Sequence, residues 1–126
     1  MPAATDRHLH DGDLLKDAER WDNAGYHYGI AAECALKGAM QRIGVKLREW
    51  EVGGADSYYL HFPDLCNLAL EHTGRISVTV AQRLQNRSFM QFWTIKMRYT
   101  GKVVSKEQCL KWRDQAHAFV SECKGI

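Results

Sequence analysis

Apolar residues recur along most of this 126-residue chain at the three- and four-residue spacing that is typical of α-helices. The clearest stripe follows Ser105 and consists of Cys109, Trp112, Ala116, Phe119, Val120 and Cys123. The pattern predicts an all-α fold, an antiparallel helical bundle of about five helices that forms one domain over residues 1–126.

Polar residues and glycines predict where the first two helices begin and end. Asp11-Gly12-Asp13 predicts the start of the first helix, which residues 5–10 could extend, and residues 1–10 are expected to form a loosely ordered N-terminus. Residues 23–25 predict a break before the second helix, which is expected to end near Gly44.

The second half of the chain carries two further start signals. Ser88 and Ser105 are each followed three residues later by glutamine, a spacing that favours a capping box at a helix start. Residues 76–80 alternate like a strand, but a lone strand would lack a partner, so a helix through Leu84 is predicted. The apolar stripe expected after Ser88 consists of Phe89, Phe92, Trp93 and Met97.

The helix expected over residues 26–40 combines small residues with one pair of charges. Glu33 and Lys37 are spaced i,i+4 with the acid first, the favourable order for an ion pair. Charges within a small-residue, apolar helix predict a seam where another helix packs closely, so we expect Glu33 and Lys37 at such a seam. The small residues also favour an isologous homodimer.

Composition is ordinary for a globular protein, with 45% hydrophobic and 25% charged residues. No run approaches the roughly 18 apolar residues of a membrane span, and no signal-peptide pattern is found, which predicts a cytoplasmic protein without membrane contact. The cysteines are too scattered for a zinc pattern, so no metal and no cofactor are expected. They are Cys34, Cys66, Cys109 and Cys123.

Charge is distributed unevenly, although the net charge is only +2. Residues 1–74 sum to −5, whereas residues 75–113 sum to +8 with Glu107 as their single acid. Two interpretations stay open: a basic surface for phosphate groups, or two complementary halves of one bundle.

Three arginines in the basic segment lie on one stripe if the helix there is nearly continuous. Arg83, Arg87 and Arg98 then fall within about 60° of one another, and guanidinium forks suit phosphate oxygens. Tyr99 is placed to stack a base beside such a phosphate contact. The alternative is that the stripe pairs with acids of the first two helices.

The histidines give weaker signals. Arg113 and His117 share a helix face and could hold a phosphate or form an unusual catalytic pair. His8 is expected to be solvated at a frayed terminus, and His27 to bond a carbonyl within the helix seam. The sequence has no Gly-rich phosphate loop, no Ser/His/Asp nucleophile set and no paired-carboxylate site.

Three segments, taken in order, resemble the HEPN family (higher eukaryotes and prokaryotes nucleotide-binding domains). Residues 26–40 are similar to its second helix, His61-Phe62-Pro63-Asp64-Leu65 to the start of its third, and Trp93-Thr94-Ile95-Lys96-Met97-Arg98-Tyr99 to the segment before its last helix. With the order of helices, the resemblance covers roughly residues 12–124.

The resemblance implies a dimeric helical bundle with a cleft for nucleotide or RNA. Many members are metal-independent ribonucleases of toxin–antitoxin, phage-defence or mobile-element systems, and carry an arginine followed after four to six residues by histidine. Here the fifth residue after Arg87 is Phe92, and the Arg113–His117 spacing is one residue short. A catalytically silent, nucleotide- or RNA-binding domain is therefore the leading hypothesis.

Two alternatives remain at this point. One is a ribonuclease that uses Arg113 and His117. The other is a subunit whose basic face binds an acidic protein, such as an antitoxin or a nucleotidyltransferase.

Overall fold

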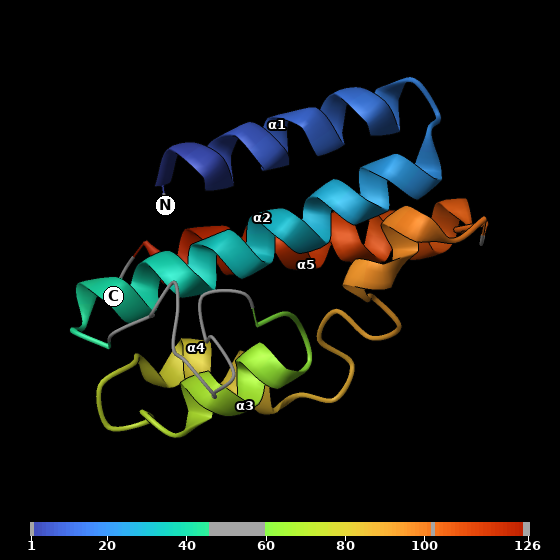
Figure 1. The fold of residues 1–126 in the computed structure, drawn as a ribbon. Coiled ribbons are helices and arrows are strands. Elements are labelled where there is room, and N and C mark those ends of the chain that lie inside the picture. The colour runs from blue at the N-terminus through green and yellow to red at the C-terminus, as the bar shows by residue number, and fades with distance from the viewer. Residues whose placement is uncertain (1, 46–59, 102, 125–126) are drawn as a thin grey trace.

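The structure, a computed structural model, describes residues 2–45, 60–101 and 103–124, and in these parts it has helices and connecting turns but no strands (Figure 1). The elements are α1 (Pro2–Asp17), α2 (Trp21–Arg42), α3 (Asp64–Leu70), α4 (Val78–Gln85), the 3-10 helix η2 (Ile95–Tyr99) and α5 (Lys106–Cys123). The predicted all-α bundle is confirmed. None of the helices in the described ranges is both long and apolar enough to cross a bilayer.

The long helices α1, α2 and α5 pack together, and the short helices α3 and α4 lie together beneath α2 (Figure 1). Helix α1 runs antiparallel to α2. Helix α5 runs in the same direction as α2, because Asp22 meets Val104 at one end of the pair and Arg42 meets Cys123 at the other. The connection from α4 through η2 carries the chain back to the end where α2 begins.

Helix α2 is the central helix and is buried along most of its length. Its glycines accept aromatic rings from other elements of the same chain: Gly25 lies against Trp112 and Gly29 against Trp93. The close packing predicted for this helix is therefore present, and it is filled from within the chain. At Gly25 and Gly29, helix α2 therefore has no free surface of small residues against which a second copy of the chain could pack.

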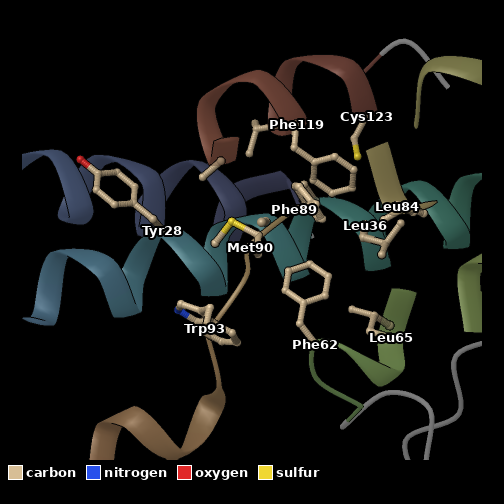
Figure 2. Close-up of a cluster of buried hydrophobic side chains, with 14 of the residues drawn as sticks. Tyr28, Leu36, Phe62, Leu65, Leu84, Phe89, Met90, Trp93, Phe119 and Cys123 are labelled. Carbon is tan, nitrogen blue, oxygen red and sulfur yellow. The ribbon is translucent and has the colours of Figure 1, made fainter. Parts of the chain in front are cut away.

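The aromatic core joins α5 to the segments around α3 and η2. The Phe89 ring lies 4.8 Å from that of Phe119 and 5.7 Å from that of Phe62. Trp93 lies beside Phe62 in the same cluster (Figure 2). The stripe predicted for the last helix is confirmed, since all six of its residues are buried.

The N-terminus differs from its prediction, because residues 2–10 are helical rather than loosely ordered. Thr5 is buried, and Leu9 packs against the core. Gly12 does not start the helix but lies in its interior, where a Cβ would approach the Tyr28 ring to 2.9 Å. Packing of α1 on α2 thus overrides the local start signal and the helix-weakening glycine.

The break expected at residues 23–25 is also misplaced. The turn comes earlier, at residues 18–20, where Glu19 has a φ of 60°. The predicted end of α2 is confirmed: the helix stops at Arg42, and Gly44 adopts a φ of 86°, a conformation that glycine tolerates without strain.

Candidate nucleic-acid interface

The predicted single arginine stripe is wrong, because no continuous helix connects Arg83 to Arg98. Helix α4 ends at Gln85, and residues 87–92 form turns before η2. The three arginines consequently lie on three different segments: α4, the turn and η2.

Long-range hydrogen bonds stabilise the turn against the helix predicted there. Gln115 of α5 accepts from the Met90 N–H at 2.9 Å and donates to the Ser88 carbonyl at 2.9 Å. The Ser88 N–H donates to the Asn86 side chain, so Ser88 does not cap a helix. Phe92 has a φ of 71° and a largely exposed ring, which removes it from the predicted apolar stripe.

Arg83 forms a fork-like ion pair with Glu122 of α5. Its Nε donates to Oε2 at 3.1 Å, and its Nη2 pairs with Oε1. This hydrogen bonding holds the pKa of Arg83 above its usual range. The contact ties α4 to α5, so Arg83 has a structural partner, although one on the last helix rather than on the first two.

Arg87 is exposed and lines a hollow of about 440 Å³ between α3 and the end of α4. Cys66 and Phe89 are among the other residues of this hollow. Burial raises the pKa of the Cys66 thiol to about 12, so the thiol is neutral at pH 7.

Arg98 and Tyr99 lie together at the exposed end of η2. The Arg98 guanidinium carbon is 4.7 Å from the centroid of the Tyr99 ring, and 77% of Tyr99 is exposed. Hydrogen bonding to Tyr26 is the main factor that raises the pKa of Arg98. Tyr26 in turn stacks on Trp93, whose indole N–H donates to the Gly25 carbonyl at 3.0 Å. The buried aromatic core thus supports the position of an exposed arginine.

Two hollows adjoin η2. One, of about 420 Å³, is lined by the segment before α3, including His61, and by the start of η2, including Lys96. The other, of about 360 Å³, is mainly apolar and contains Phe92 and Met97. Residues three apart in a 3-10 helix lie directly above one another, so Lys96 and Tyr99 share a face of η2.

Glu33 and Lys37 are both buried. The sequence predicted that these two residues lie at a seam between helices. Only 2% of Glu33 is exposed, and its carboxylate accepts from His61 Nδ1 at 2.8 Å and from the Phe62 N–H at 2.7 Å. Burial raises the pKa of Glu33, and the hydrogen bonds from His61 and Phe62 act in the opposite direction.

His61 is the residue of this region that sequence reasoning missed as a candidate. In the sequence it stands out only as part of the segment that resembles the start of a family helix, and its carbonyl does accept the Leu65 N–H. A buried acid in an apolar helix requires a donor from another element. The position of Glu33 in the sequence indicated that its carboxylate needs a donor, but it did not indicate which residue is the donor.

Arg113 and His117 do not converge on an open phosphate site. Arg113 pairs with its neighbour Asp114 at 2.8 Å, whereas His117 Nε2 lies 3.0 Å from Asp13 of α1. Tyr28 also donates to Asp13, at 2.6 Å. Burial acts to raise the pKa of Asp13, but the hydrogen bonds from Tyr28 and His117 outweigh it, and the pKa lies below its usual range.

The ion pairs of the basic segment bear on the two interpretations of its charge. Arg83 and Arg113 pair with Glu122 and Asp114, both near the C-terminus. Within the described residues, no ion pair joins residues 75–113 to an acid of residues 1–74. In this part of the chain, the two halves therefore do not neutralise each other by direct contact.

Comparison of the chain with protein-family models, with curated proteins and with solved structures finds no match.

Proposed function

We propose that this protein is a catalytically silent, HEPN-like domain that binds a nucleotide or RNA at the surface formed by Arg98 and Tyr99 on η2. The observation that carries the proposal is the exposed tyrosine ring with a guanidinium group 4.7 Å from its centre. Each base has a flat face that can stack on tyrosine, and a neighbouring arginine can bind the phosphate.

Among the three arginines, Arg98 is the best placed for a ligand. Arg83 already binds a carboxylate, so a phosphate would have to displace Glu122. Arg87 is exposed but lies on a different segment from the Arg98 site. The proposal therefore centres on Arg98 and Tyr99 and assigns a structural role to Arg83.

The binding test uses a short single-stranded RNA labelled with a fluorophore, followed by anisotropy at low salt. We expect Arg98→Gln and Tyr99→Ala each to weaken binding about tenfold, because each removes one charge-assisted or stacking contact. The salt dependence of Arg98→Gln should become shallower by about one contact. Both residues are exposed, so the melting temperature should stay within a degree or two of wild type.

Arg83→Gln is the matched control. It removes an arginine from the same basic segment but also breaks the Arg83–Glu122 pair, which is worth up to about 1 kcal/mol at such a partly exposed site. We expect a lower melting temperature and unchanged RNA affinity below that temperature. Wild type that binds no RNA at low salt would refute the proposal, and an acidic protein partner would then become the leading hypothesis.

The proposal includes a homodimer, which rests on the family resemblance. Gly25 and Gly29 already contact aromatic rings of the same chain, so a dimer must form through another surface. Light scattering at micromolar concentration should return about twice the chain mass of 14.4 kDa. A mass of one chain over the accessible range would contradict this part alone.

A further inference from the structure

We propose that the hollow lined by His61 and Lys96 holds a phosphate group of the nucleic acid whose base stacks on Tyr99. This inference rests on the proposed function and assigns two ligand contacts that the arginine pattern did not suggest. It also assigns the buried Glu33 as the residue that positions His61.

The buried carboxylate fixes which nitrogen of His61 is left for a ligand. Glu33 holds Nδ1 at 2.8 Å, and its other oxygen is held by the Phe62 N–H at 2.7 Å. Both distances are in the range of charge-assisted bonds to a carboxylate. With Nδ1 bonded to Glu33, Nε2 is the nitrogen of the partly exposed His61 side chain that is left for a ligand, and it donates to a phosphate oxygen when the ring is protonated.

The position of Lys96 links the hollow to the stacking site. Lys96 lines the hollow, and Tyr99 lies one 3-10 turn further along the same face of η2. One such turn rises about 6 Å. A base on Tyr99 and a phosphate beside Lys96 are therefore separated by a distance that one nucleotide spans.

The charges around the hollow are mixed. Asp64, at the start of α3, lines the same hollow as Lys96, so its carboxylate offsets part of the positive charge that Lys96 supplies. On the side of α2, the buried Glu33 has the positive charge of Lys37 one helical turn away. A phosphate in the hollow therefore needs contacts from both His61 and Lys96.

The experiment measures the affinity of the same single-stranded RNA at low salt. His61→Gln should bind about tenfold more weakly than wild type, because it loses one contact to the phosphate. Lys96→Gln should also weaken binding about tenfold, because it loses a charge-assisted contact. His10→Gln, at an exposed histidine of α1, is the control and should behave as wild type.

Two results separate this inference from the proposed function. If Tyr99→Ala loses affinity while His61→Gln and Lys96→Gln keep wild-type affinity, the phosphate contact is refuted and the proposed function stands. If wild type binds no RNA, the proposed function fails, and pyrophosphate is titrated while the His61 imidazole is observed by NMR. A saturable shift that Lys96→Gln abolishes supports the anion site, and its absence overturns it.

Discussion

At the scale of single residues, close contacts of glycines decide how far the aromatic core can approach α2. A Cβ on Gly29 would lie 1.8 Å from the Trp93 ring, far inside any van der Waals contact. The same indole donates to the Gly25 carbonyl and stacks against Tyr26. Gly29 thus permits the packing that supports Tyr26 and, through it, Arg98.

Replacement of Gly29 by alanine should destabilise the protein by about 2 kcal/mol. Alanine favours a helix by about 1 kcal/mol over glycine, but displacement of the Trp93 ring costs more, as overpacked cores do. Denaturant unfolding measures the difference. Gly74→Ala is the control, because a Cβ there meets nothing within 4 Å, and it should change stability by less than about 1 kcal/mol. Equal effects of the two substitutions would contradict this account of the seam.

Removal of the Glu33 carboxylate should also be costly. Glu33→Ala leaves the Phe62 N–H and the His61 imidazole without their acceptor and removes the charge that faces Lys37. The expected loss is about 3 kcal/mol, seen as a fall of several degrees in melting temperature. Glu71→Ala, at an exposed acid after α3, should leave the melting temperature within noise. If Glu33→Ala also leaves the melting temperature within noise, the pairing of Glu33 with Lys37 contributes little to stability.

At the scale of elements, side-chain caps decide where α4 and α5 begin. The Ser77 hydroxyl accepts from the Val80 N–H at 3.2 Å, and the Ser105 hydroxyl accepts from the Gln108 N–H at 3.1 Å. The sequence predicted the second of these caps correctly. It predicted a third at Ser88, where the structure has turns.

The difference between these serines can be measured. Ser105→Ala and Ser77→Ala should each destabilise the protein by about 1 kcal/mol, because each exposes an unsatisfied N–H group in the first helical turn. Ser88→Ala should cost less than about 0.5 kcal/mol, because it removes only an exposed hydroxyl bond to Asn86 at 2.7 Å and keeps the main-chain bonds to Asn86 and Gln115. A cost at Ser88 equal to that at Ser105 would argue for a helix start at Ser88.

At the scale of the whole molecule, histidines attach α1 to the rest of the bundle at two places. The His8 and His27 rings stack at 5.3 Å and share a hydrogen bond of 3.0 Å between their Nδ1 atoms, in contrast to the predicted solvated His8 and carbonyl-bonded His27. His117 of α5 contacts Asp13. Burial is the main factor that lowers the pKa of both His8 and His27.

These shifts predict that stability falls as the pH decreases below about 6.5, the usual pKa of histidine. In that range the unfolded chain binds protons that the folded His8 and His27 resist, so acid favours unfolding. Thermal unfolding between pH 7.5 and 5.0 should show a smaller decrease for His27→Gln than for wild type. His10→Gln should keep the wild-type decrease, and an unchanged slope in His27→Gln would contradict the contribution of the pair.

The sequence by itself determined the helical class, the end of α2 near Gly44 and the buried stripe of α5. It also indicated the chemistry around Glu33, because a charge in an apolar helix must find a partner. These properties depend on residues close together in the chain: helical periodicity, caps and the conformational freedom of glycine. Local physics is sufficient for them.

Only the tertiary structure decided which side chains form hydrogen bonds and ion pairs with one another. Gln115 lies far along the chain from the turn that it stabilises, and Glu122 takes Arg83 out of the predicted stripe. Helix α1 extends through residues 2–10 because α2 offers a face to pack against. Such contacts join residues that the sequence separates by dozens of positions, and no local pattern specifies which donor meets which acceptor. The grouping of His61 with Glu33, and of His61 with Lys96 beside a hollow, is of this kind.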